Sequence, residues 1–259
     1  MKIALFLLAL LISTPAPAEP IARPPADAGF AISLSTPNLN PTPGIGVYEI
    51  DLFDAAQPTI DALHAAGGYV ICYFSAGSIE DWRPDVAAFP ESVIGKKYEG
   101  WEGERWIDIR QREALAPIFG DRMNLAVAKR CDAVDPDNVD GFGNETGFEI
   151  SAVDQRAFNL WLAEAAHQRG LAIGLKNASE LVLDLVEAFD FAVIENCATQ
   201  EGCDTYQPFA ARKKAVFQIE YRDETEDWAA VCQDAARRGF TAILAGLALD
   251  GTAETCSRR

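Results

Sequence analysis

One short stretch, Asp132–Gly143, concentrates acidic side chains where an apolar strand should end. Within it Asp135 and Asp137 lie two residues apart, so both carboxylates face the same side if the strand continues that far. Pro136 fits a strand end because it has no N–H to donate, and Gly141 begins the loop beyond. Such carboxylates suit acid–base catalysis. The alternative is a solvated acidic turn or a loose cation-binding loop, although the stretch lacks the spacing of an EF-hand.

The elements that would position these carboxylates follow a regular alternation of short apolar runs and longer amphipathic segments, which is typical of repeated βα units around a parallel sheet. The apolar runs predict eight strands, at Val47–Leu52, Tyr69–Phe74, Trp106–Ile109, Ala133–Asp137, Leu171–Lys176, Phe191–Glu195, Ala215–Tyr221 and Thr241–Ala245. The amphipathic segments predict helices that include Gln57–Ala66, Arg112–Arg130, Val153–Arg169, Glu180–Ala188 and Glu226–Arg238.

Eight βα units in a chain of 259 residues predict an α/β fold, the (β/α)8 TIM barrel. The helix expected after Ser151 begins with a capping pair, Ser151 and Asp154, and ends at Gly170. An extended piece, Phe30–Ser35, precedes the first strand without an intervening helix, so it is expected to add an extra N-terminal strand or to plug the barrel. The alternative is an open doubly wound sheet, but no Gly-x-Gly-x-x-Gly or phosphate-loop pattern follows any strand.

Seven of the eight predicted strands end in polar or charged residues. Barrel enzymes carry their active sites at these C-terminal ends, and converging so many ionisable groups costs desolvation unless they are paired, so this rim is the predicted site. Any single group could instead form a structural ion pair, as Asp108 with Arg110 or Lys176 with a neighbouring carboxylate. The residues expected to bind substrate are Asp51, Tyr73, Ser75, Asp108, Asp135, Asn138, Lys176, Asn196, Glu220 and Tyr221.

Convergent carboxylates without a Ser-His-Asp set, a metal-ligand cluster or a cofactor loop favour glycoside hydrolysis, in which one carboxyl group protonates the leaving oxygen and another attacks the sugar or activates water. The predicted catalytic pair is Asp137 and Glu195, with no metal and no cofactor. Because their strands lie two apart, we expect the ~5–5.5 Å separation of a retaining pair. Glu195 ends an apolar run, so burial is expected to raise its pKa and favour the acid role, with Asp137 as nucleophile.

The N-terminal residues have the composition of a secretory signal peptide. Lys2 precedes an unbroken apolar run, Ile3–Ile12, and Ala16–Ala18 supplies a small-x-small site, so residues 1–18 are expected to be removed after Ala18. The run is too short to remain as a membrane span. Residues 19–28, rich in Pro and Ala, are expected to be a flexible leader, and residues 29–259 a single domain that is secreted or periplasmic.

The charge balance is strongly acidic, since 39 acidic against 22 basic residues give a net charge of −17. This excess argues against nucleic acid or an anionic membrane as a partner, and it would attract a polycation. The alternative explanation is that an acidic surface only keeps an exported protein soluble.

Six cysteines in an exported chain predict disulfides, and Cys197 with Cys203 is the favoured pair because the two flank a short loop. The remaining predicted pairs are Cys232 with Cys256 and Cys72 with Cys131, in one of fifteen possible connectivities. Metal binding is the weaker alternative, because the chain has no Cys-x-x-Cys and its two histidines lie in helical patterns far from any cysteine.

Several strings of residues along the chain resemble those of one enzyme family. They are Tyr48–Asp54, Val70–Gly77, Trp106–Arg110, Asp135–Gly141, Gly174–Asn177, Glu195-x-Cys197, Cys203-Asp-x-Tyr206 and Glu220-Tyr221. The first, second and fourth are distinctive in combination, and together the strings span nearly all of the chain after the signal peptide. The family they resemble is glycoside hydrolase family 114, the endo-α-1,4-polygalactosaminidases.

The resemblance implies a barrel with an extra strand and an endo-acting hydrolase of α-1,4-linked galactosamine polymers, with Asp137 and Glu195 at the positions of the family's two catalytic carboxylates. Unacetylated galactosamine is cationic, so an acidic groove would attract the polymer. Tyr73, Trp82 and Tyr221 are candidates to stack on sugar faces. The expected partner is therefore a cationic amino-sugar polysaccharide, bound by a monomer.

Two positions depart from the family pattern. Phe30–Leu34 stands where members tend to have a strand with Trp and Gln, and Ile194 stands where an Asn is expected before Glu195. Two alternatives therefore remain open: a catalytically silent polysaccharide-binding barrel, and a glycosidase with a different amino-sugar specificity.

Overall fold

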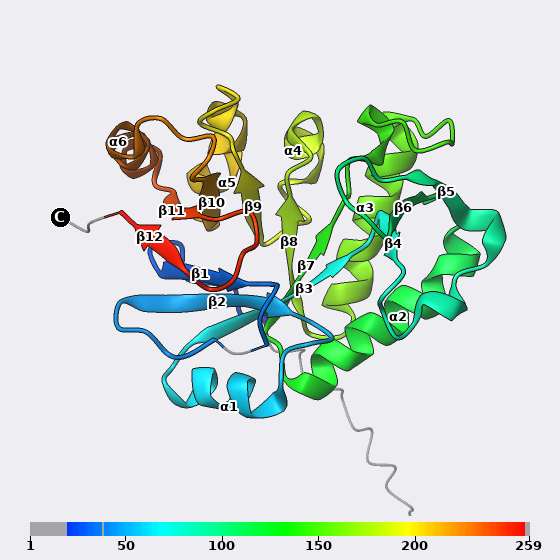
Figure 1. Ribbon diagram of the computed structural model, residues 1–259, viewed down its shortest axis with the longest axis horizontal. Coiled ribbons are helices and arrows are strands. Elements are labelled where there is room, and N and C mark those ends of the chain that lie inside the picture. The colour runs from blue at the N-terminus through cyan, green and yellow to red at the C-terminus, as the bar shows by residue number, and fades with distance from the viewer. Residues whose placement is uncertain (1–19, 38, 257–259) are drawn as a thin grey trace, which may run out of the picture.

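The computed structural model describes residues 20–37 and 39–256, and within them eight parallel strands form a nearly closed barrel (Figure 1). The predicted (β/α)8 fold is therefore confirmed. In spatial order the parallel strands are β1 (Gly29–Ser33), β2 (Ile45–Asp51), β3 (Tyr69–Ser75), β7 (Ala133–Asp137), β8 (Ala172–Lys176), β9 (Phe191–Glu195), β10 (Val216–Tyr221) and β11 (Thr241–Ala245).

The seam between the first and last parallel strands is closed by the C-terminal part of the chain. β12 (Ala253–Thr255) pairs antiparallel with β11. Just before it, Asp250 forms an antiparallel bridge with Ser33 of β1, and the Leu34 N–H donates to the Leu249 carbonyl at 2.8 Å. The barrel is thus completed by residues near both ends of the described chain.

The helices lie outside the barrel and agree with the sequence to within a few residues, except that the one expected at 180–188 is largely a single turn. α3 begins with the predicted capping box, in which the Ser151 hydroxyl accepts from the Asp154 N–H and the Asp154 carboxylate accepts from the Ser151 N–H. The helices are α1 (Gln57–Ala65), α2 (Arg112–Lys129), α3 (Ala152–His167), α4 (Val182–Leu185), α5 (Gln207–Ala211) and α6 (Trp228–Arg238).

Alternation along the strands divides the apolar side chains into two cores. One core lies between the sheet and the helices. The other takes its members only from strands and their flanking segments, so it fills the barrel interior, where the Phe30 and Phe217 rings stack 4.5 Å apart. Both cores are closely packed, which fixes the positions of the strand ends above them.

An insertion between β3 and α2 forms a separate antiparallel sheet, in the order β4 (Ser78–Glu80), β6 (Glu104–Ile107) and β5 (Ile94–Lys97), beside α2 in Figure 1. The sequence assigned Trp106–Ile109 to the barrel, and this is wrong. The loop between β5 and β6 is too short for the crossover that parallel pairing requires, so the two form a hairpin. The extended piece at Phe30–Ser35 supplies the eighth barrel strand instead.

The buried Arg122 of α2 anchors this insertion. Its Nε and one terminal nitrogen donate to the Asp85 carboxylate at 2.7 and 2.9 Å, and its other terminal nitrogen donates to the Ser75 carbonyl at 2.6 Å. Four rings surround the guanidinium at 5.2–5.9 Å, those of Phe53, Phe74, Phe89 and Phe119. A helix, a barrel strand and the insertion therefore meet at one side chain.

All three predicted disulfides form: Cys72–Cys131, Cys197–Cys203 and Cys232–Cys256. The first joins β3 to the residues just before β7, and the third ties α6 to the residue after β12. Both closed loops are long enough for the bond to restrict the unfolded chain substantially.

The segment expected to be a flexible leader lies against the barrel where its described residues, 20–28, can be followed. Arg23 donates to Asp190 at 2.9 Å, the Tyr69 hydroxyl donates to the Ala22 carbonyl at 2.9 Å, and Ile21 packs on the interior core. The predicted signal peptide, residues 1–18, lies outside the described residues. Among the described residues, none of the helices is long and apolar enough to cross a membrane.

Candidate active site

Three adjacent strands, β7, β8 and β9, end in side chains that meet at one point. The Lys176 ammonium lies 3.2 Å from an Asp137 oxygen and 3.3 Å from a Glu195 oxygen. The lysine side chain is 3% exposed, whereas the two carboxylates are 17% and 22% exposed. One buried cation therefore holds the two predicted catalytic carboxylates side by side, with both open to solvent.

Each of these strands is followed by an asparagine in the left-handed backbone region, where asparagine is tolerated better than most residues. The φ angles are 59° for Asn138, 49° for Asn177 and 52° for Asn196. The turn directs the chain away from the barrel directly after the charged side chain. The same local pattern, a charged residue followed by Asn, thus occurs at each of the three strand ends that form the site.

The Asp137 carboxylate is held by hydrogen bonds from its surroundings. The Tyr73 hydroxyl donates to it at 3.0 Å and the Asn138 N–H at 2.7 Å. Behind it, the Gly77 N–H donates to the Asp137 carbonyl at 3.1 Å, and a side chain at Gly77 would collide with the Asn138 carbonyl. Glycine at this position therefore allows the insertion to leave β3 close to the catalytic strand end.

The Glu195 carboxylate accepts hydrogen bonds from the Tyr221 hydroxyl and from the Asn177 amide, the latter at 3.0 Å. Burial raises the pKa of Glu195, but the Lys176 charge and these hydrogen bonds outweigh burial, so its pKa lies below the ordinary value. The expectation of a raised pKa is wrong, because the sequence showed the apolar run before Glu195 but not the donors around it.

The charge of Lys176 is secured by the same arrangement. Burial lowers its pKa, but Asp137, Glu195 and Asp135 outweigh that effect, so the pKa lies well above the ordinary value. The ammonium also lies 5.6 Å from the centre of the Tyr73 ring. The surrounding carboxylates therefore favour the charged form of Lys176.

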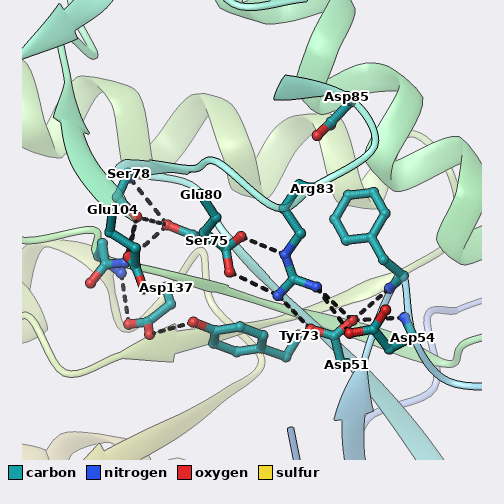
Figure 2. A network of polar contacts seen from close by, with 12 residues as sticks. Asp51, Asp54, Tyr73, Ser75, Ser78, Glu80, Arg83, Asp85, Glu104 and Asp137 are labelled. Atoms are coloured by element: carbon teal, nitrogen blue, oxygen red, sulfur yellow. Dashed lines mark hydrogen bonds and ion pairs between the residues drawn. The ribbon is translucent and has the colours of Figure 1, made fainter. Parts of the chain in front are cut away.

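The insertion adds a second polar network to the same rim, shown in Figure 2. The Ser78 hydroxyl donates to Glu104 at 2.7 Å, and the Asn138 amide donates to Ser78 at 3.2 Å. Farther along, Arg83 lies between Glu80 and Asp51, with contacts of 2.8 and 2.6 Å. These hydrogen bonds connect the small sheet to the strand end that carries Asp137.

Two insertion-facing carboxyl groups differ from ordinary surface acids. Burial, with a smaller contribution from neighbouring Glu80 and Asp137, raises the pKa of Glu104 to about 7. Burial and the Asp137 charge raise the pKa of Asp140 to about 6. Both groups thus titrate near neutrality beside the predicted catalytic pair.

These residues line a pocket of about 400 Å³ at the C-terminal end of the barrel. Its walls come from the rim of the barrel, from the insertion, and from the segment Leu247–Leu249 that closes the seam. Trp82 and Trp101, which are 51% and 49% exposed, form part of the lining on the insertion side. The size is that of a site for one or a few sugar units.

The structure brings some of the predicted site residues to this pocket and places others behind it. Those that line the pocket are Asp51, Tyr73, Asn138, Lys176, Tyr221, Asp137 and Glu195. Ser75, Asp135, Asn196 and Glu220 are buried behind the lining, while Asp108 follows β6 and forms an ion pair with Arg110 at 2.7 Å. Asp108 therefore forms the structural ion pair with Arg110 that was the alternative to a role in substrate binding.

Sequence reasoning missed most of the insertion wall. The residues it missed there are Glu80, Arg83, Tyr98, Trp101 and Glu104, and on the seam side it also missed Leu247–Leu249. A usable signal existed in the cluster of acidic and aromatic residues from Glu80 to Glu104, but it was obscured by assigning Trp106–Ile109 to the barrel. Asp140 was visible in the acidic stretch and was not singled out.

One group of side chains has the spacing of a metal site in the part of the chain that the structure describes, namely Cys197, Cys203 and Glu220. The two cysteines are joined in a disulfide, so neither sulfur is available as a thiolate ligand. This group therefore does not suggest metal binding.

Comparisons with known proteins agree with this geometry. The model of glycoside-hydrolase family GH114 matches residues 12–259. The crystal structure of Aspergillus fumigatus Ega3 in complex with galactosamine is 37% identical and superposes with a TM-score of 0.84, covering 91% of this chain and 97% of that one. No curated protein sequence matches the chain.

More distant structures share the fold alone. The glycoside hydrolase domain of PelA from Pseudomonas aeruginosa is 12% identical with a TM-score of 0.65, covering 88% of this chain and 98% of that one. A GH18 chitinase from Pseudoalteromonas aurantia is 10% identical with a TM-score of 0.51, covering 85% and 94%. With the family model matched over nearly the whole chain, the protein belongs to glycoside-hydrolase family GH114 and is a glycosidase.

Proposed function

We propose that this protein is an exported endo-glycosidase that cleaves α-1,4-linked galactosamine polymers with Asp137 and Glu195 as its catalytic carboxylates. The observation that carries the proposal is the pair of partly exposed carboxylates held by the single ammonium of Lys176 at the floor of the pocket. The three disulfides support a place outside the reducing cytoplasm, and the signal peptide stays a prediction.

The spacing of the carboxylates supports a retaining mechanism. Each has an oxygen within 3.3 Å of the same nitrogen, so these two oxygens lie no farther apart than about 6.5 Å, the lower limit for inverting pairs. In such a mechanism one carboxylate attacks the anomeric carbon while the other carboxyl group gives its proton to the leaving oxygen. Water then hydrolyses the glycosyl ester, and the proton donor is restored.

The charge of the pocket supports a cationic substrate. The described lining residues include seven acidic side chains, Asp51, Asp54, Glu80, Glu104, Asp137, Asp140 and Glu195, against the two cations Arg83 and Lys176. Both cations are already bound by carboxylates. The pocket is therefore net negative, which favours an ammonium-bearing sugar. The bound galactosamine in the Ega3 structure supports the same substrate class.

Of the two departures from the family pattern, Phe30–Leu34 reaches the pocket lining at Leu34, whereas Ile194 does not line the pocket. Phe30 stacks on Phe217 in the barrel interior, and neither ring lines the pocket. Ile194 is fully buried in the core that faces the helices. Neither Phe30 nor Ile194 lines the pocket, and Asp137 and Glu195 both accept side-chain hydrogen bonds, which favours a catalytically competent site over a silent binding barrel.

The test is incubation of the chain lacking residues 1–18 with partly deacetylated polygalactosamine, followed by sizing of the products. We expect short oligomers and a loss of at least about a thousandfold in kcat/KM for both Asp137→Asn and Glu195→Gln. Asp184→Asn and Glu145→Gln, at exposed positions, are matched controls that should retain activity. Full activity of both site variants would refute the mechanism, and binding without cleavage by the unmodified protein would indicate the silent barrel.

Azide rescue of the two variants assigns their roles. A variant that lacks the nucleophile should yield a glycosyl azide of inverted configuration, and one that lacks the acid–base group should yield the retained anomer. A panel of other amino-sugar glycans in the same assay identifies a different specificity.

A further inference from the structure

Two carboxyl groups lie one layer deeper in the barrel than the catalytic pair. Asp135 precedes Asp137 by two residues on β7, and Glu49 precedes the rim residue Asp51 by two residues on β2, so both side chains point into the interior. Both are fully buried and neither lines the pocket. They are close enough for each carboxyl group to alter the pKa of the other.

The strand neighbours of Glu49 in this buried pair are apolar. Glu49 is paired in register with Ile32 on one side and Ile71 on the other, and both belong to the interior core. On β8, a side chain at Gly174 would lie 2.8 Å from an Asp135 oxygen, so glycine leaves the space that this carboxyl group occupies. The fold has made room for two buried acids without providing them with donors.

Within residues 20–37 and 39–256, none of the four oxygens of Glu49 and Asp135 has a hydrogen-bond partner when both groups are ionised. Ionised carboxylates only accept hydrogen bonds, so two of them cannot bond to each other. A single proton changes this, because the protonated group can then donate to its neighbour. Without that proton the pair would leave buried polar atoms unsatisfied, at considerable cost.

The charges that face Glu49 and Asp135 also favour protonation of the pair. Lys176 of β8 is the cation among them, while Asp137 of β7 and Glu195 of β9 add two further negative charges. Burial is the largest cause that raises the pKa of Glu49 well above the ordinary value, and burial also raises the pKa of Asp135 to about 7. One ammonium therefore faces four carboxyl groups, of which the two deeper ones retain protons most readily.

We propose that Glu49 and Asp135 are positioning residues that retain at least one proton between them, and that the Lys176 ammonium stays bound to Asp137 and Glu195 while both groups are protonated. When the pair becomes negatively charged, the new charge beneath Lys176 draws the ammonium inward and weakens its hold on the catalytic carboxylates. The effect on catalysis rests on the proposed function, whereas the protonation of the pair does not.

The proposal predicts the alkaline side of the pH–activity profile. Below about pH 7 both groups are protonated, the pair is neutral and Lys176 stays at the pocket floor. Above it Asp135 ionises while Glu49 keeps its proton, so the pair becomes negatively charged and kcat declines. Asp135→Asn keeps the shape of the protonated group but cannot ionise. We therefore expect this variant to remain active at low pH and to shift the alkaline decline upward by at least about one pH unit.

The experiment combines kcat–pH profiles with ¹³C NMR titration of the side-chain carboxyl carbons, in the unmodified protein, Asp135→Asn and Glu49→Gln. We expect one carboxyl group of the pair to stay protonated through pH 7 in the unmodified protein. Asp190→Asn, a buried carboxylate at the opposite end of the barrel, is the matched control and should leave the alkaline decline in place. Glu49→Gln leaves Asp135 as the titrating group of the pair, so this variant should keep an alkaline decline, and its NMR titration should place the ionisation of Asp135 at that decline even if Asp135→Asn fails to fold.

Two results would overturn the proposal: both carboxyl groups of the pair ionising fully below pH 5, or an Asp135→Asn profile that superposes on that of the unmodified protein. The NMR titration needs no substrate. A protein that cleaves no galactosamine polymer therefore refutes the proposed function while leaving the protonation of the pair measurable.

Discussion

Two nearly fully buried cations, Lys176 and Arg122, lie near the same end of the barrel and have opposite surroundings. Arg122 is matched by one carboxylate, Asp85, through two hydrogen bonds, and by the carbonyl of Ser75. Lys176 faces the carboxylates of Asp137 and Glu195, with two further carboxyl groups beneath it. The first centre is balanced in charge and the second has an excess of acid.

The difference is that between a structural centre and a proposed catalytic one. Around Arg122 the donors point at fixed acceptors and aromatic faces, so the centre is satisfied without a ligand. Around Lys176 the excess of carboxyl groups leaves some of them protonated and others free to act on a substrate. The excess of carboxyl groups around Lys176, more than burial itself, is what distinguishes the proposed catalytic centre from the centre around Arg122.

The largest effect on activity is expected when the positive charge of Lys176 is removed from the centre that has excess carboxyl groups. Lys176→Met should lower kcat/KM by about a thousandfold, or about 4 kcal/mol, because Asp137 and Glu195 lose the charge that holds them together. Circular dichroism should show a folded protein, since the deeper acids can take up protons. Activity within tenfold of the unmodified protein would contradict the comparison.

A substitution at the balanced centre, around Arg122, should change the stability of the protein and not its catalytic rate. Arg122→Met leaves Asp85 without its partner and should lower the free energy of unfolding by about 3 kcal/mol, or the melting temperature by roughly 6–12 °C. In the folded variant kcat should change by less than about fivefold. Arg156→Met, at a half-exposed ion pair of 3.7 Å, is the matched control and should shift melting little.

The pH dependence of stability sharpens the comparison further. Asp135 and Glu104 titrate at about 7 and Asp140 at about 6 in the folded state, above ordinary carboxyl values. The folded state therefore holds protons that the unfolded chain releases, and stability falls as pH rises through these values. The lowered pKa of Glu195 has the opposite effect, because it makes stability fall as the pH decreases, but this occurs only below about pH 5.

Thermal melting between pH 5 and pH 8 measures this dependence. We expect the melting temperature to fall by roughly 5–10 °C over that range. Asp135→Asn should reduce the slope, whereas Arg122→Met should shift the curve without changing its slope. A melting temperature that rises over this range would contradict the assigned directions.

The smallest effect is expected at the pocket rim, away from both cations. Trp82 is half-exposed on the pocket wall, and its removal takes away an aromatic face for a sugar ring. Trp82→Ala should raise KM about five- to tenfold on long polymers with kcat nearly unchanged, in keeping with ~1 kcal/mol for such a contact. Recovery of KM by Trp82→Phe would support stacking, and an equal loss in kcat would contradict it.

The rim of the barrel could be predicted from the sequence because each strand end is a local pattern. The apolar runs that end in Asp137, Lys176 and Glu195 are visible in the chain, and parallel packing brings their ends together. The insertion could not be predicted in the same way, since β5 and β6 have only four residues each and their pairing depends on tertiary contacts.

The pKa shifts in the site could not be predicted from the sequence either. The lowered pKa of Glu195 depends on where Lys176, Tyr221 and Asn177 place their donors, which no local pattern shows. The unpartnered state of Glu49 and Asp135 likewise follows from packing across strands that are distant in sequence. The charged residues could be predicted from the sequence. Their protonation states could not, because these depend on neighbouring groups that only the folded structure shows.

The seam at which Asp250 meets Ser33 has a consequence for the order of folding. The first barrel strand obtains its last hydrogen-bonding neighbours only after nearly the whole chain has been synthesised. Until then its free side is an open template for other extended chains, which makes the nascent protein vulnerable to misassembly. The bond from Cys232 to Cys256 then locks the arrangement from outside.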